Sequence, residues 1–105
     1  MRFITSGREY RSIYDDNTKF IGKFFIFLKK KKPENLLSIG IVVNKKVGNA
    51  VVRNKIKRRV KAFFRENIFD VGYDVVIIAG PDSAAADWLS IKKELNDYFM
   101  NLKKI

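Results

Sequence analysis

A strongly basic amphipathic segment, KKVGNAVVRNKIKRRVKAFFRE at residues 45–66, places the firmest constraint on how this chain folds. It carries nine Lys or Arg residues and a single carboxylate, that of Glu66. At about 100° per residue, its apolar side chains share one helical face: Val52, Ile56, Val60, Phe63 and Phe64. A helix with one apolar face buries that face against a core. The segment therefore predicts a helix that ends near Asn67 and is fixed by a fold, unlike a disordered basic tail.

The charge of the chain indicates a polyanionic partner. The formal net charge is +11 over 105 residues, and the sequence pI is about 10. A basic patch clustered on one helix is the electrostatic footprint of a nucleic-acid binder. The alternative is a basic protein whose charge serves only solubility. The length suits one domain with one core, so we predict a single RNA-binding domain over residues 1–105.

Residue types that are absent exclude several kinds of chemistry. The chain has no cysteine and no histidine. Disulfides, the usual zinc sites, cysteine nucleophiles and histidine acid–base catalysis are therefore excluded. No apolar run is long enough to span a membrane, and the first residues lack the apolar centre of a secretory signal. We expect a cytoplasmic protein without a membrane partner.

The apolar pattern predicts helices and strands in alternation. Ser6, Asn49 and Asp87 are suited to cap the three helices, and Glu9 completes a capping-box pattern with Ser6. The extended segment after the first helix contains Gly22, which predicts a bulge or bend there. In chain order we predict a helix over 6–14, an extended segment over 18–28, a solvated hairpin connection over 29–35, a strand over 36–43, the basic helix, a strand over 73–79 and a helix from about 88 to 103.

This order predicts an α+β fold. Helix faces and one sheet must be buried together, which favours a two-layer sandwich with a mixed sheet of about four strands. A strand–helix–strand unit, from 36–43 through the basic helix to 73–79, lies at its centre. If those two strands are parallel neighbours, the general rule predicts a right-handed crossover.

The basic helix and the loop before it resemble a known family. The loop reads Lys45-Lys46-Val47-Gly48-Asn49-Ala50-Val51, and the helix continues with Arg-Asn-Lys-Ile-Lys-Arg at residues 53–58. Together they resemble the bacterial ribonuclease P protein subunit, and the element order is similar over nearly the whole chain. Asn44, Lys55 and Gly80-Pro81 depart from the family pattern, which often has Ser, Arg and a basic residue at these places.

The resemblance implies a function and a set of site residues. It implies a protein that binds a catalytic RNA and helps it to remove the 5′ leader of precursor tRNA, with Mg²⁺ bound mainly by the RNA and no further protein partner required. It also implies a left-handed crossover. The RNA-binding residues implied are Lys45, Lys46, Asn49, Arg53, Asn54, Lys55, Lys57, Arg58, Lys61 and Arg65. The residues implied for a leader cleft between the first helix and the sheet are Tyr10, Tyr14, Lys19, Phe25 and Phe27.

Two questions stay open at this stage. The aromatic side chains of the first helix and of 18–28 either stack unpaired bases or form plain core, because a small domain also needs aromatics for burial. The chain is either a ribonuclease P subunit or a structural RNA-binding protein of ribosomal type. A self-contained metal nuclease is a weaker alternative. No carboxylate occurs between residues 35 and 65, so we expect no catalytic or metal-binding residue in the protein itself.

Overall fold

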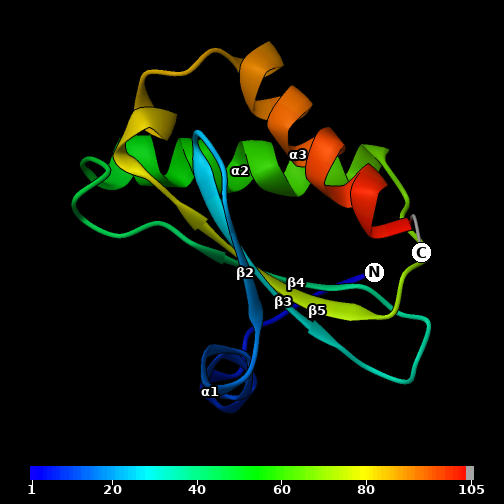
Figure 1. The fold of residues 1–105 in the computed structure, drawn as a ribbon. Helices are drawn as coiled ribbons and strands as arrows, with labels where there is room; N and C mark the ends of the chain where they lie inside the picture. The colour runs from blue at the N-terminus through cyan, green and yellow to red at the C-terminus, as the bar shows by residue number, and fades with distance from the viewer. Residues whose placement is uncertain (104–105) are drawn as a thin grey trace.

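The computed structural model describes residues 1–103 and consists of one five-stranded sheet with helices on both faces. Helix α1 covers one face, and α2 and α3 cover the other (Figure 1). The elements are β1 (Arg2–Phe3), α1 (Gly7–Asp15), β2 (Thr18–Ile21), β3 (Phe25–Lys31), β4 (Ser38–Val42), α2 (Ala50–Glu66), β5 (Tyr73–Ala79), the short 3₁₀ helix η1 (Pro81–Ala84) and α3 (Trp88–Lys103).

The sheet is mixed, with the strand order β1-β4-β5-β3-β2. Strands β4 and β5 are parallel neighbours joined by α2, so the condition stated for the strand–helix–strand unit is met. Strand β3 runs antiparallel to β5, and β2 runs antiparallel to β3. The predicted α+β class is confirmed. The fifth strand, β1, pairs with β4 over only two residues, which is too short to leave a period-two pattern in the sequence.

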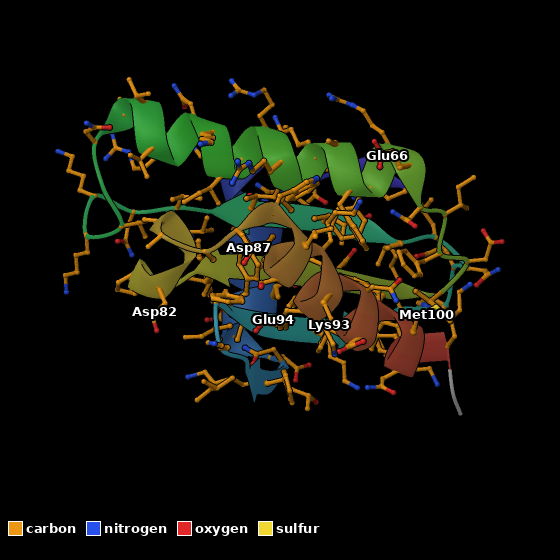
Figure 2. All side chains as sticks on the ribbon, turned by 90° about the horizontal axis from the view of Figure 1, so that it is seen from above. Glu66, Asp82, Asp87, Lys93, Glu94 and Met100 are labelled. Carbon is orange, nitrogen blue, oxygen red and sulfur yellow. The ribbon has the colours of Figure 1, made fainter. Side chains whose placement is uncertain are left out.

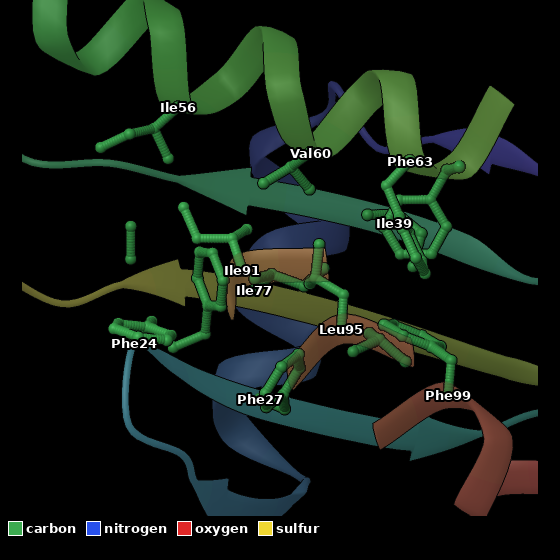
Figure 3. Close-up of a cluster of buried hydrophobic side chains, with 14 of the residues drawn as sticks. Phe24, Phe27, Ile39, Ile56, Val60, Phe63, Ile77, Ile91, Leu95 and Phe99 are labelled. Atoms are coloured by element: carbon green, nitrogen blue, oxygen red, sulfur yellow. The ribbon is translucent and has the colours of Figure 1, made fainter. Parts of the chain in front are cut away.

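The larger core lies between the sheet and helices α2 and α3 (Figure 3). The apolar face of α2 packs against the core as predicted. Helix α3 contributes Ile91, Leu95, Phe99 and Leu102, whereas its Leu89 is exposed. The side chains that meet there include Phe27, Ile39, Ile56, Val60, Phe63, Ile77, Ile91, Leu95 and Phe99. This burial fixes α2 on the sheet and leaves its other sides free.

A smaller core lies under α1 on the opposite face of the sheet. Ile13 of α1 is buried with Ile4, Leu28 and Val76. Helix α1 begins as predicted at Ser6, whose Oγ accepts a hydrogen bond from the backbone N–H of Arg8. The capping box is incomplete, because the carboxylate of Glu9 pairs with Arg2 of β1. The other two predicted caps are confirmed, by Asn49 for α2 and Asp87 for α3.

The prediction of a hairpin connection over 29–35 is wrong. Strand β3 continues through Lys31, and its lysines at 29, 30 and 31 pair with Val75, Asp74 and Tyr73 of β5. The segment that follows leads to β4, which is not a neighbour of β3 in the sheet. Four consecutive lysines indicate a solvated loop, but three of them lie at the end of the β3–β5 ladder. Lys32, which follows β3, donates hydrogen bonds to Asp74 and Ser38 at 2.8 Å each.

The break near Gly22 is a full hairpin turn between β2 and β3, not the predicted bulge or bend within one strand. The carboxylate of Glu94 on α3 stabilises this turn. It accepts hydrogen bonds from the backbone N–H groups of Lys23, Phe24 and Phe25 at 2.7–3.0 Å. A Cβ at Gly22 would lie 2.6 Å from that carboxylate, so the close approach requires glycine.

Replacing Glu94 by glutamine should lower the free energy of unfolding by about 1–2 kcal/mol, because an amide accepts these hydrogen bonds less strongly than a carboxylate. Chemical denaturation followed by circular dichroism measures the change. Asp97→Asn is the matched control, since Asp97 makes only an exposed ion pair with Lys93 and should change stability by less than about 1 kcal/mol. Equal effects of the two substitutions would contradict the role given to Glu94.

Candidate nucleic-acid interface

Helix α2 presents a basic surface on every side except its buried face. Arg53, Lys57 and Lys61 recur at intervals of four residues and are half-buried, and Arg65 continues the same row in full exposure. The row extends over about 18 Å of helix at 1.5 Å per residue. Asn54, Lys55 and Arg58 are exposed beside it. Figure 2 shows nitrogen-tipped side chains projecting from α2 on the side away from α3, whereas Asp82, Asp87 and Glu94 lie on η1, at the start of α3 and on α3.

The loop before α2 extends this surface. The side chain of Asn44 accepts a hydrogen bond from the backbone N–H of Lys46 at 3.0 Å, and Val47 is buried as an anchor. This turn leaves Lys45 and Lys46 exposed. Asn49 accepts a hydrogen bond from the backbone N–H of Val52, and no acidic residue occupies the first turn of the helix. The positive end of the α2 dipole is therefore not neutralised by a carboxylate of that turn.

The charge of α2 is not balanced within the protein. Three ion pairs form among residues 1–103, and none of them involves α2. Like charges at four-residue spacing destabilise a helix by about 0.2–0.5 kcal/mol per pair, so the row on α2 is a cost that the buried face offsets. A surface that retains such repulsion is suited to a polyanion, which would neutralise it.

Arg59 belongs to the α2–α3 boundary and not to the free basic surface. Its guanidinium lies 5.9 Å from the centre of the Trp88 ring, and Lys92 approaches the same ring at 5.6 Å. Trp88 thus contributes to packing at the start of α3, and Arg59 lies against its ring.

A second candidate surface lies beside α1. The rings of Tyr10 and Tyr14 stack with centres 6.4 Å apart. Tyr10 is half-buried over Gly40, where a Cβ would lie 2.6 Å from the ring, and burial raises the pKa of its phenol. Tyr14 is 47% exposed. The register of β2 with β3 places Lys19 opposite Leu28, which packs under α1, so Lys19 faces the α1 side.

Comparison with known proteins decides what this arrangement is. The family model described as Ribonuclease P matches residues 2–103. The chain belongs to the ribonuclease P protein family. The ribonuclease P protein component of Carboxydothermus hydrogenoformans is 41% identical over 81 residues, which cover 73% of this chain and 70% of that protein. The component from Fusobacterium nucleatum is 34% identical across the full length of both chains.

Solved structures of ribonuclease P proteins share the fold. The Thermotoga maritima protein aligns with a TM-score of 0.80 and 29% identity over 93% of this chain and 92% of its own. The Staphylococcus aureus protein aligns with a TM-score of 0.83 and 25% identity, covering 98% and 95% of the two chains. The resemblance noted from the loop and the basic helix therefore extends to the whole fold.

The predicted RNA-binding residues of this chain come together on one surface. All of them lie on the loop 45–49 or on α2, and none is fully buried: Lys45, Lys46, Asn49, Arg53, Asn54, Lys55, Lys57, Arg58, Lys61 and Arg65. The side chain of Asn49 accepts the hydrogen bond that caps α2. Its contribution to this surface is therefore to fix the backbone at the start of the helix.

The predicted leader-cleft set does not come together. Phe25 and Phe27 are 1% and 0% exposed, and they lie in the core on the α2–α3 side of the sheet, opposite to Tyr10 and Tyr14. The prediction that these two phenylalanines line the α1 side is therefore wrong. Side chains alternate between the faces of a strand, so an assignment shifted by one residue places every side chain on the wrong face.

The residues that do border the tyrosines were missed. Ile26, Val42 and Ile78 are half-buried beside α1, and Lys30 donates a hydrogen bond to Ser12 of α1 at 2.7 Å. The alternation in β3 separates two sets of side chains, but it does not tell which set faces which helix. The larger aromatic side chains of one set were the available signal, because the deeper core of a small domain takes the bulkier residues.

The carboxylates of the described chain do not form a metal site. Residues 1–103 contain no group of three or more Asp or Glu side chains placed to bind a metal ion. Asp74 pairs with Lys32, and Asp87 caps α3, where hydrogen bonds from Ser90 lower the pKa of its carboxyl. Within the same residues, no helix is long and apolar enough to cross a membrane.

Proposed function

We propose that this chain is the protein subunit of a ribonuclease P in which an RNA performs the cleavage. The observation that carries the proposal is the cationic surface of α2 and its preceding loop, which makes no ion pair within residues 1–103. That surface would neutralise phosphates of the catalytic RNA and release their counterions. The family membership supports this partner over an unrelated nucleic acid.

The chemistry would belong to the RNA. The carboxylates of the described residues do not fit a magnesium site, so Mg²⁺ would be bound by the catalytic RNA and not by side chains of this chain. The protein would reduce the repulsion between the RNA subunit and the precursor tRNA, and it would thereby favour the productive complex. This role places the protein with its RNA in the cytoplasm.

The α1 side is proposed to receive the 5′ leader. Exposed Tyr14, the adjacent Tyr10 and the apolar side chains of β3, β4 and β5 offer aromatic and apolar area to unpaired bases. Lys19 and Lys30 supply positive charge for the backbone of the leader. Such a surface binds single strands with little dependence on sequence.

Reconstitution tests the proposed function. Precursor tRNA is incubated with Mg²⁺ and with the protein alone, the catalytic RNA alone, or both. We expect cleavage by the RNA that the protein accelerates, and no cleavage by the protein alone. Cleavage by the protein alone would support a self-contained nuclease. Binding to RNA without any effect on cleavage would favour the alternative, a structural RNA-binding protein of ribosomal type.

Replacing Tyr14 by alanine should weaken binding of precursor tRNA to the reconstituted enzyme by about tenfold while mature tRNA binds as before, because one stacked base is lost. Affinity measurements with both RNAs provide the test. Ile68→Ala is the control, since Ile68 is an exposed apolar residue outside both candidate surfaces. An equal loss of affinity for precursor and mature tRNA would contradict the proposal that the leader binds on the α1 side.

A further inference from the structure

A groove between β2 and α3 lies on the face of the sheet opposite to α1. Its volume is about 760 Å³, which is within the range of sites for ligands of nucleotide size. One wall is formed by residues 18–24 of β2 and the following turn, and the other by Ser90, Lys93, Glu94, Asp97, Tyr98 and Asn101 of α3. Neither the basic surface of α2 nor the tyrosines of α1 belong to it.

The groove offers an aromatic platform. Phe20 is 53% exposed although it belongs to a strand, and its ring centre lies 5.7 Å from that of Tyr98. Tyr98 in turn stacks on buried Phe27 at 4.0 Å, which makes this wall rigid. The hydroxyl of Tyr98 is buried and has no hydrogen-bond partner within residues 1–103, and burial raises the pKa of this phenol.

The charge of the groove is positive once its internal pairs are counted. The carboxylate of Glu94 accepts hydrogen bonds from the backbone N–H groups of the β2–β3 turn. The carboxylate of Asp97 forms an ion pair with Lys93 at 2.8 Å. Lys23 and Lys29 also line the groove and make no ion pair among the described residues. Lys23 and Lys29 instead lie against the rings of Phe24 and Tyr73.

We propose that this groove is a second site for single-stranded RNA, which binds leader nucleotides that extend beyond the α1 side. Exposed aromatic area surrounded by lysines is the combination that stacks bases and follows a phosphate backbone. The two sites are adjacent across β2, the edge strand of the sheet, because Lys19 faces the α1 side and Phe20 faces the groove. This inference rests on the proposed function.

The same residues argue against a second copy of the chain as the occupant. Antiparallel pairing of two β2 edges would bring Lys19 of both copies close together, and lysines on an edge strand oppose such pairing. An RNA strand has the opposite charge and gains from each of these lysines.

The test compares precursor tRNAs whose leaders have about four and about twelve nucleotides, bound to the reconstituted enzyme. Phe20→Ala should lower the affinity for the long leader about tenfold and leave the short leader unchanged. Phe20→Tyr should retain tight binding of the long leader, and Phe20→Leu should lose it, because stacking requires a ring. Leu89→Ala, at an exposed residue of α3 outside the groove lining, should affect neither substrate.

Three outcomes would overturn the groove site. They are an equal loss for both leaders, a Phe20→Leu protein that binds the long leader as tightly as the wild type, and a dimer detected by sedimentation that Phe20→Ala dissolves without any effect of leader length. Each of these can occur while the wild-type protein still accelerates cleavage of both substrates. Failure of the wild-type protein to accelerate cleavage would instead contradict the proposed function.

Discussion

Replacing Arg53, Lys57 and Arg58 together by alanine is expected to weaken binding to the catalytic RNA by about two orders of magnitude at about 0.1 M salt. Each phosphate contact contributes roughly 0.7–0.9 to the slope of log affinity against log salt concentration, so three lost contacts flatten the slope by about 2–3. All three side chains leave α2 away from its buried face and form no ion pair among residues 1–103. Filter binding or fluorescence anisotropy over a salt series measures both quantities.

A matched loss of charge elsewhere controls this experiment. The triple variant Lys31→Ala, Lys92→Ala, Lys103→Ala removes the same net charge from residues that lie outside α2 and its loop. It should reduce the salt slope by less than about 1. The α2 variant should also keep its circular dichroism spectrum, because the substituted side chains are outside the core. An equal change of slope in both variants would show that net charge alone, and not the α2 surface, determines the affinity.

Replacing Phe27 by alanine is expected to cost about 3–5 kcal/mol of folding free energy. The side chain is 0% exposed, stacks on Tyr98 at 4.0 Å and contacts the rings of Phe25 and Phe99. A domain of this size has a total stability of about 5–15 kcal/mol, so much of it would be lost. Thermal unfolding should show a Tm lower by on the order of 15 °C or more.

Tyr14→Ala separates stability from binding. Tyr14 is 47% exposed, so its removal should lower the Tm by only a few degrees while it weakens leader binding. If Phe27 contributed a surface to the leader, its alanine variant would instead unfold near the wild-type temperature and bind precursor tRNA poorly. That result would contradict the placement of Phe27 in the core.

The sequence predicts well those parts of the fold in which a local pattern is compatible with only one secondary structure. Helix α2 has an apolar face, a cap at Asn49 and a charged remainder, and strand β5 is a short apolar run between turn residues. The buried face of α2 also determines where its charges lie. The position of the predicted RNA-binding residues on the free sides of α2 therefore follows from the sequence directly.

The misassigned parts depend on contacts between distant segments. The lysines after Leu28 continue a strand because β5 pairs with them, and the turn at Gly22 forms around a carboxylate more than 70 positions away in the chain. The face of β3 that meets α1 depends on the whole sheet, which is why Phe25 and Phe27 were placed on the wrong side. The groove beside Phe20 exists only after α3 packs against β2.

The most direct test of the central claim is a map of lysine reactivity with and without the catalytic RNA. Acetylation followed by mass spectrometry reports each lysine separately. Lys45, Lys46, Lys55 and Lys57 should become protected when the RNA binds, whereas Lys31 and Lys103, outside the α2 surface, should react as before. Unchanged reactivity along the loop and α2, together with protection elsewhere, would contradict the assignment of α2 as the surface that binds the RNA.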